Sequence, residues 1–331
     1  MPQPDFEEVF GLNAAYAEKV YGDYLAAPES VPEEWRTWFE TELPPEQRAV
    51  AKPKPAPVAT PAEINDELTP LTGIAGKIVK NMTESLTVPT ATSAREVPVK
   101  VMIENRYSIN RHQVGQYLPK VSFTHLIGWA MVQAIRRVPA MAAQYVQQDS
   151  GKSFRRMGKS LNIGIAVDLP GKDGRRSLVV PSIKDCQDLD FAGFFGGFND
   201  QISKSRKGKL TPADFAGTTC TLTNPGTIGT VSSLPRLMVG QSFIMATGAI
   251  NVPGAFQGAA AETITELGVS QVMMLTSTYD HRVIQGAESG QFLDWIHKLL
   301  LGEENFYEDI FASLKVPYRP VHNSIDRRPP L

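Results

Sequence analysis

The sequence of 331 residues predicts an α/β (α+β) fold in which helices cover one mixed β-sheet. From Leu71 onward, apolar residues switch between helical spacing and short strand-like runs, so helices and strands follow one another along the chain. Two strand candidates are joined by the turn Gly171 to Gly174, which is typical of a β-hairpin. Because a hairpin pairs antiparallel strands, this order favours a mixed sheet over a doubly wound parallel one.

Residues 1–43 form the first predicted unit, a short helical segment. A helix is expected over residues 14–25 with Asn13 as its N-cap, and a second over residues 32–41. The segment is rich in aromatic side chains, which are Tyr16, Tyr21, Tyr24, Trp35, Trp38 and Phe39. Two short helices cannot bury this much apolar surface alone. We therefore expect the segment to dock either on a partner or on the chain's own core.

Residues 44–68 predict a stiff, extended linker, because prolines recur there among alanines and lysines. The main domain is expected over residues 69–316, followed by a polar tail at 317–331. Helices of this domain are predicted at 74–86, 123–138 and 191–206, and after Gly286. Strands are predicted at 162–169, 177–183, 218–223, 243–250 and 271–279.

The composition excludes several classes of protein. Hydrophobic residues make up 42% and charged residues 21% of the chain, and the net charge is −2, so we expect neither nucleic acid nor a membrane as a partner. We also expect no secretion signal and no membrane span, since no apolar run is long enough. The two cysteines, Cys186 and Cys220, cannot form a disulfide framework, which favours a cytoplasmic location. No group of residues has metal-ligand spacing.

One histidine, His281, follows an apolar strand candidate and precedes a helix that begins at Gly286. A strand-to-helix junction holds a side chain at a fixed angle and leaves its tip accessible, which suits a general base. A histidine in such a place can equally be a core residue that is hydrogen-bonded to backbone. The neighbouring residues favour the catalytic interpretation.

Four blocks carry a family resemblance, in the same order along residues 70–313. Asp280 to Gly286 resembles the motif DHRxxDG, and Gly217 to Gly226 resembles GGTFTISNLG. Leu178 to Ile183 resembles GLVVPVI, and Ile74 to Pro89 resembles the opening helix IAKRMxxSxxxxP. These are the motifs of the 2-oxo acid dehydrogenase dihydrolipoyl acyltransferases. The resemblance implies their two-layer chloramphenicol-acetyltransferase fold.

A second resemblance lies in the first segment. Val9 to Asn13, Tyr24 to Val31 and Trp35-Arg36 resemble the amino terminus of the thiamine-dependent 2-oxoglutarate dehydrogenases. Both features in one chain resemble the actinobacterial multifunctional 2-oxoglutarate decarboxylases. We find no thiamine diphosphate motif and no lipoyl attachment site in the sequence. The acyl group is therefore expected to arrive on the lipoyl domain of a separate acyltransferase, and a decarboxylase part is expected as a fused or separate partner.

The resemblance implies transfer of a succinyl group from a dihydrolipoyl sulfur to coenzyme A, as part of the tricarboxylic acid cycle. A thiol is mostly protonated at neutral pH, so a base is needed, and His281 is the candidate. Thr223 lies where the family places its hydrogen-bond donor to the oxyanion. The resemblance also implies a homotrimer, with the base and the donor on opposite sides of a channel between subunits.

The sequence departs from the family at Gln285, where an aspartate is usual. In the family this aspartate pairs with an arginine of the opening helix, which aligns here with Asn81. We therefore expect a Gln285–Asn81 hydrogen bond in place of the ion pair. Asp280 and Arg282 are expected to be structural residues beside the base.

Two other functions stay open at this point. The chain could be a non-catalytic trimeric assembly module for the decarboxylase component, which the departure at Gln285 and the missing lipoyl domain favour. It could also be a free acyltransferase that acts on small hydroxyl or amine substrates. The dehydrogenase-like first segment argues against this third function, and the pair His281 and Thr223 favours the succinyltransferase.

Overall fold

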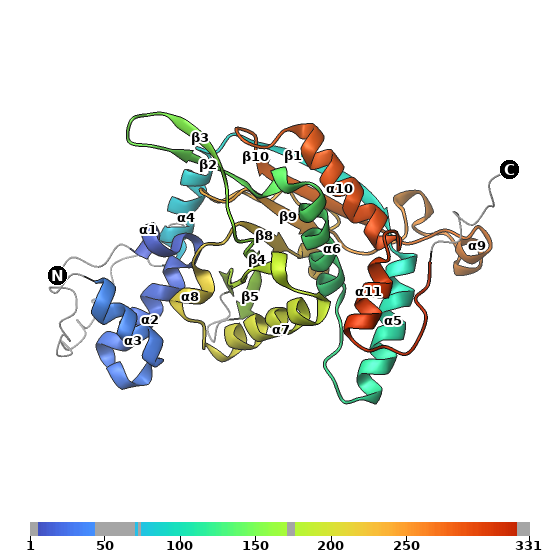
Figure 1. Ribbon diagram of the computed structural model, residues 1–331, viewed down its shortest axis with the longest axis horizontal. Helices are drawn as coiled ribbons and strands as arrows, with labels where there is room; N and C mark the ends of the chain where they lie inside the picture. Colours follow the sequence, from blue (N-terminus) through green and yellow to red (C-terminus); the bar gives the residue numbers. More distant parts are fainter. Residues whose placement is uncertain (1–5, 44–69, 72–73, 171–175, 323–331) are drawn as a thin grey trace.

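The computed structural model describes residues 6–43, 70–71, 74–170 and 176–322, and Figure 1 shows their arrangement. The predicted linker at 44–68, the turn Gly171 to Gly174 and most of the tail lie outside the described residues. The helices of the first segment are α1 (Phe6–Phe10), α2 (Ala14–Ala26) and α3 (Glu33–Glu42). The remaining helices are α4 (Ile74–Ser85), α5 (Lys100–Gly115), α6 (Phe123–Arg137), α7 (Phe191–Lys207), α8 (Pro212–Phe215), α9 (Ala261–Glu266), α10 (Gly286–Leu300) and α11 (Phe306–Ser313).

The predicted mixed sheet forms the centre of the domain and has six strands. Its strands, in spatial order, are β1 (Thr90–Pro98), β10 (Val272–Asp280), β9 (Phe243–Thr247), β8 (Cys220–Thr223), β4 (Ile163–Ile165) and β7 (Ser182–Ile183). The β9–β8 and β8–β4 pairs are parallel, and the other pairs are antiparallel. Two hairpins stand beside this sheet, β2 (Ala143–Gln147) with β3 (Ser153–Met157) and β5 (Val167–Pro170) with β6 (Arg176–Val179).

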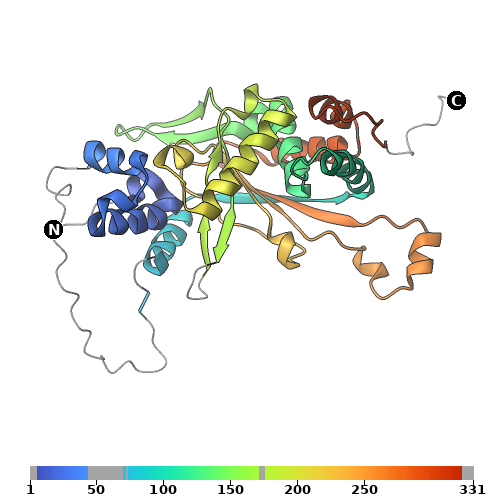
Figure 2. The same ribbon diagram turned by 90° about the horizontal axis from the view of Figure 1, so that it is seen from below.

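The two faces of the sheet differ in chemistry because side chains alternate along each strand. On one face, Phe243 packs its ring against Phe292 of α10, with the ring centroids 5.0 Å apart. Helices α6, α7 and α10 lie together on that side, as Figure 2 shows. The other face carries threonines of neighbouring strands, which are Thr92, Thr221, Thr223, Thr276 and Thr278. The loop between β8 and β9 covers part of this hydroxyl-rich face, where Thr276 donates a hydrogen bond to the Ser233 carbonyl.

Several elements were not predicted from the sequence. These are α1, β1, α5, the β2–β3 hairpin, α8, α9 and α11. Strand β1 is rich in threonine, serine and alanine, and it pairs only with β10 at the sheet edge, so it lacks the apolar alternation that identifies a half-buried strand. The predicted β8, β9 and β10 are correct to within a few residues. No described helix is long and apolar enough to cross a membrane.

The first segment docks on the chain's own core. Its aromatic rings form a cluster, and Phe10 and Tyr16 both contact the ring of Phe215, at centroid distances of 6.5 and 5.7 Å. The indole of the fully buried Trp35 donates a hydrogen bond to the Leu210 carbonyl. These contacts join α1–α3 to the α7–α8 region in one hydrophobic core.

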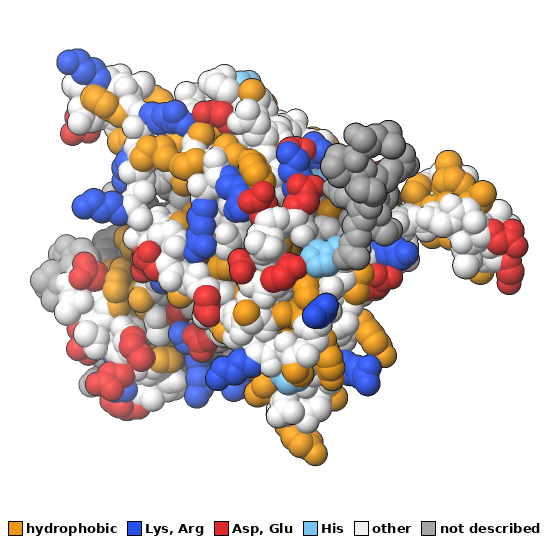
Figure 3. All heavy atoms as spheres, turned by 45° about the vertical axis from the view of Figure 1, so that its right-hand side comes forward, with side chains coloured by type: hydrophobic (Ala, Val, Ile, Leu, Met, Phe, Trp, Pro, Cys, Tyr) orange, Lys and Arg blue, Asp and Glu red, His pale blue; other side chains and the backbone are white. Residues whose placement is uncertain are grey.

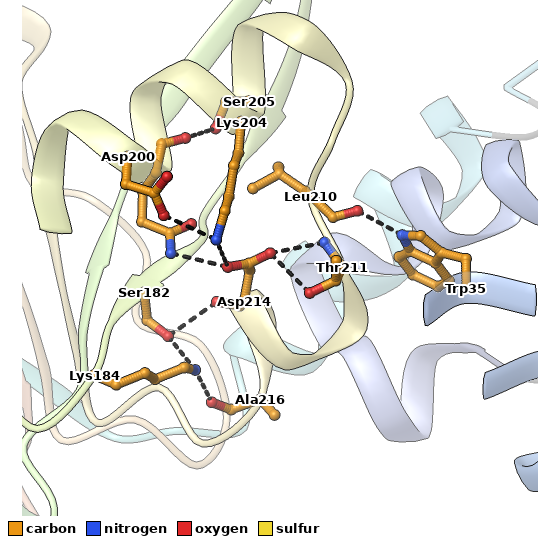
Figure 4. Close-up of polar contacts among 11 residues, drawn as sticks. Trp35, Ser182, Lys184, Asp200, Lys204, Ser205, Leu210, Thr211, Asp214 and Ala216 are labelled. Atoms are coloured by element: carbon orange, nitrogen blue, oxygen red, sulfur yellow. Dashed lines mark hydrogen bonds and ion pairs between the residues drawn. The ribbon is translucent and has the colours of Figure 1, made fainter. Parts of the chain in front are cut away.

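A polar network supports this junction (Figure 4). The buried Asp214 accepts hydrogen bonds from the backbone and side chain of Thr211 and from Gln201, and it pairs with Lys204 at 3.2 Å. Burial alone would raise the pKa of Asp214, but these hydrogen bonds and the Lys204 charge lower it below its ordinary value. The ionised carboxylate therefore fixes the loop that receives Trp35.

Residues 251–270 form an arm that projects from the body of the molecule. Every residue of the arm is exposed or half-buried, and Leu267 is 62% exposed. Figure 3 shows the arm standing clear, with acidic side chains at its far end. A segment that buries so little of its own surface gains little from contacts within one chain.

The expected helix-capping role of Asn13 is wrong. Its side chain makes no capping hydrogen bond to α2, and instead its Oδ1 accepts from the buried backbone N–H of Val180, 2.8 Å away. A capping role and a core contact predict different responses to serine, which caps helices as well as asparagine does but is too short to reach Val180.

We predict that Asn13→Ala and Asn13→Ser both lower the free energy of unfolding by about 1–3 kcal/mol, because each leaves the Val180 N–H buried without an acceptor. Urea unfolding of the two variants and the wild type measures this. Recovery of wild-type stability by serine alone would instead favour the capping role.

His125 is a buried residue of the core, and it makes stability depend on pH. Its Nδ1 accepts from the Ser122 N–H at 2.9 Å, and its ring lies against Phe195 and Phe198. Burial, with a smaller effect of the Arg106 charge, lowers the pKa of His125 to about 4. Below about pH 6.5 the unfolded chain binds this proton first, so the folded state loses stability as the pH falls toward 4.

We predict that the wild type loses about 3 kcal/mol more stability than His125→Gln between about pH 7 and pH 4. Glutamine at this third helical position keeps an acceptor for Ser122 but does not titrate. Urea unfolding at several pH values tests the difference in slope. Parallel stability curves for the two proteins would contradict this role of His125.

Candidate functional site

His281 lies immediately after β10 and five residues before α10, at the predicted strand-to-helix junction. The strand ends there because Asp280 is the last residue paired with β1, opposite Thr90. The backbone N–H of His281 donates to the Pro89 carbonyl at 2.9 Å, which ties the junction to the edge strand. The imidazole itself is exposed to solvent.

The imidazole of His281 is held in one tautomer. Its Nδ1 lies 3.1 Å from the carbonyl oxygen of Ile284. A carbonyl can only accept, so Nδ1 carries the proton and donates it. In the neutral ring, Nε2 is then unprotonated and available as a base. This arrangement supplies what a thiol substrate needs, namely an accessible acceptor of fixed orientation.

Asp280 and Arg282, which flank His281 in the sequence, bind to each other. The Arg282 guanidinium donates two hydrogen bonds to the Asp280 carboxylate, at 2.9 and 2.7 Å, and the Arg282 backbone N–H donates a third at 3.0 Å. Asp280 is buried, and its carboxylate raises the pKa of Arg282 above its ordinary value. Both residues were expected to be structural, and in the structure they form an ion pair that shapes the loop.

Thr223 is the last residue of β8, and the loop that follows it packs tightly against the end of β9. A side chain on Gly226 would collide with the backbone of Gly248, and one on Gly248 would collide with the Val231 carbonyl. Both positions therefore require glycine. Among the described residues no hydrogen bond occupies the Thr223 hydroxyl, which is free to donate to a ligand.

The strand register separates Thr223 from His281 within one chain. Thr223 aligns with Ala246 of β9, and Ala246 aligns with Thr276 of β10, five residues before His281. The two residues are thus five residues apart along the strand direction and two strands apart across the sheet. These offsets place their Cα atoms about 19 Å apart. A base and an oxyanion donor that serve one acyl group must lie within about 7 Å of each other. One chain therefore cannot bring its own two residues to the same substrate.

The expected Gln285–Asn81 hydrogen bond is not present in the described part of the chain. Gln285 is exposed at the N-cap of α10, where its backbone N–H donates to the Glu288 carboxylate at 2.7 Å. The buried Asn81 donates to the Gly11 carbonyl at 3.4 Å, so it contacts the first segment. The prediction was wrong because neither partner could be read from local sequence. The pattern Gln285-x-x-Glu288 does match a capping box, a local signal that could have been used.

Other candidate groups do not contribute to this site. Burial raises the pKa of both thiols, that of Cys186 to about 12, so neither cysteine is a ready nucleophile. Lys204, at the end of α7, pairs with Asp200 and Asp214. Within the described ranges no cluster of histidine, cysteine or carboxylate side chains could hold a metal ion.

One neighbour of the site was missed by sequence reasoning. Tyr145, in β2, lies under the Arg282 guanidinium, 3.7 Å from its ring centroid. No local pattern marks this tyrosine, because the contact joins segments that are far apart in the chain.

Known proteins resemble this chain in both of its parts. Residues 63–307 match the family described as 2-oxoacid dehydrogenases acyltransferase (catalytic domain), and residues 9–42 match the 2-oxoglutarate dehydrogenase N-terminus. A multifunctional 2-oxoglutarate metabolism enzyme of Mycolicibacterium vanbaalenii is 52% identical over 273 residues, which are 82% of this chain and 22% of that protein. One from Mycobacterium sp. (strain JLS) is 49% identical over 80% of this chain and 21% of its own length. The chain thus spans about a fifth of these relatives.

Solved structures share the fold. The catalytic core of a 2-oxoacid dehydrogenase multienzyme complex from Thermoplasma acidophilum is 26% identical with a TM-score of 0.57, covering 70% of this chain and 97% of that one. The cubic core of a pyruvate dehydrogenase complex is 22% identical with a TM-score of 0.60, covering 78% and 99%. These likenesses confirm the predicted fold class. The chain therefore belongs to the 2-oxoacid dehydrogenase acyltransferase family and contains its catalytic domain.

Proposed function

We propose that this chain transfers a succinyl group from a dihydrolipoyl domain on another protein to coenzyme A, within a 2-oxoglutarate dehydrogenase system. The observation that carries the proposal is the state of His281, an exposed imidazole whose Nδ1–H is engaged by the Ile284 carbonyl and whose Nε2 is free. The names of the relatives, which refer to 2-oxoglutarate metabolism, support the succinyl group. The family supports the transfer reaction.

In the proposed reaction, Nε2 of His281 takes the proton from the thiol of coenzyme A. The resulting thiolate attacks the carbonyl carbon of the succinyl thioester and forms a tetrahedral oxyanion. The hydroxyl of Thr223 donates a hydrogen bond to this oxyanion, where charge develops in the transition state. The intermediate then collapses, the dihydrolipoyl sulfur leaves, and it takes the proton back from His281.

We propose that the chain acts as a homotrimer with each site shared by two copies. The distance between His281 and Thr223 in one chain supports this, because a second copy is needed to bring the two together. Apolar side chains stand exposed on the loop after Thr223, with Ile228 76% and Leu234 70% exposed, and on the projecting arm. Exposed apolar surface of this kind is typical of subunit interfaces.

The proposed partners are the lipoyl domain of a separate acyltransferase and a thiamine-dependent decarboxylase part. The match of residues 9–42 to the dehydrogenase N-terminus supports the decarboxylase. Two buried, unpaired cysteines are compatible with the cytoplasm as the proposed location. The alternative function, a non-catalytic trimeric assembly module, is favoured by Gln285, which stands where the family usually has aspartate.

The proposal is tested by incubating the chain with coenzyme A and a succinyl-dihydrolipoyl domain and measuring succinyl-coenzyme A. We predict that His281→Ala lowers the rate by about 10²–10⁴-fold. Thr223→Val should lower it by about 10²-fold, while Thr223→Ser keeps a hydroxyl and most of the rate. His112→Ala, which removes a histidine of α5, serves as the matched control and should leave the rate unchanged.

Transfer at the wild-type rate by His281→Ala would contradict the catalytic role. A wild-type chain that forms trimers but transfers no succinyl group would favour the assembly module.

A further inference from the structure

The β2–β3 hairpin lies against the loop that carries His281, although the two are far apart in the sequence (Figure 1). Tyr145 and Arg155 are directly opposite each other in the hairpin register, so both side chains project from one face. Tyr145 places its ring 3.7 Å from the Arg282 guanidinium carbon, and Arg155 approaches the Glu288 carboxylate at 3.4 Å. One face of the hairpin therefore touches both ends of residues 282–288.

The contact between Tyr145 and Arg282 also involves Asp280, so it reaches the residues before and after His281. The guanidinium that stacks on Tyr145 is the same one that holds the Asp280 carboxylate at 2.9 and 2.7 Å. Stacking on an aromatic face leaves the edge of a guanidinium free for such a bidentate pair. The ring thus fixes the plane in which Arg282 meets Asp280. That plane in turn sets the path of the backbone through His281.

Tyr145 is itself well placed to act as a fixed support. Its hydroxyl hydrogen-bonds to Ser153 across the hairpin at 2.8 Å, and the ring is half-buried. The second contact, Arg155 with Glu288, is long and partly exposed to solvent, so it contributes less. Glu288 also accepts from the Gln285 N–H at the start of α10.

We propose that Tyr145 is a positioning residue for His281, acting through Arg282 and Asp280. The expected effect on the transfer rate rests on the proposed function. The expected effect on the order of the loop at residues 280–288 does not. Every residue of β3 is exposed, and Tyr145 in β2 is only half-buried where it packs against the core. Because leucine keeps an apolar side chain at this position, Tyr145→Leu should disturb the loop more than the fold.

The test compares Tyr145→Leu, which removes the aromatic face, with Tyr145→Phe, which keeps the face and loses only the hydroxyl. Tyr107→Leu makes the same change at an exposed tyrosine of α5 and is the matched control. Amide hydrogen exchange of the full chain is measured by mass spectrometry on peptides that span residues 280–288. The transfer assay gives kcat and KM for coenzyme A.

For Tyr145→Leu we expect amide exchange in the loop to be at least about threefold faster. We also expect kcat to be about tenfold lower, with KM for coenzyme A within about twofold of the wild type. Tyr145→Phe and Tyr107→Leu should match the wild type in all three measurements. Rescue by phenylalanine identifies the ring face, and not the hydroxyl, as the positioning group.

Unchanged loop exchange in Tyr145→Leu would overturn the inference. So would faster exchange with unchanged kcat, or a change confined to KM. If the wild type has no transferase activity, the proposed function fails, and the exchange experiment alone decides whether the ring orders the loop.

Discussion

The register of three neighbouring strands, β8, β9 and β10, determines where the site that we propose can form. It places Thr223 and His281 toward opposite ends of neighbouring strands, too far apart to share a substrate within one chain. Backbone hydrogen bonds along the strands fix this separation, and a slip by one residue would move every side chain to the opposite face. Because one chain keeps Thr223 and His281 apart, the mechanism that we propose requires two copies to associate. Association would then serve catalysis as well as stability.

At the end of β10, a few short-range contacts fix the position of His281, the base that we propose. The Ile284 carbonyl selects the tautomer, the Pro89 carbonyl holds the backbone, and the Asp280–Arg282 pair closes the loop. Strand β10 precedes His281 and helix α10 follows it, so the imidazole is exposed but its backbone is anchored on both sides. Rigid support of a solvent-accessible group is a common arrangement for catalysis, because folding has already fixed the geometry of the group before the substrate binds.

Much of the fold, and the place of His281 at a strand-to-helix junction, could be predicted from the sequence, because these signals are local. The apolar runs of β9 and β10, and the strand–turn–helix pattern around His281, lie within single short segments. The errors concern contacts between distant segments: Asn13 reaches Val180, and Asn81 reaches Gly11. Tyr145 was missed for the same reason. Strands show an apolar periodicity and helix ends show capping residues, so both can be recognised in the sequence. Side-chain contacts between distant segments produce no such local pattern.

A site made by two copies is tested most directly by complementation between inactive chains. His281→Ala and Thr223→Val chains are unfolded together, refolded as an equal mixture, and assayed for succinyl transfer to coenzyme A. In randomly mixed cyclic trimers, about a quarter of the sites combine an intact His281 from one copy with an intact Thr223 from the next. If each site is shared by two copies, about a quarter of the wild-type rate should be recovered from two nearly inactive parents. A mixture no more active than its parents, although sedimentation finds mixed trimers, would contradict a shared site.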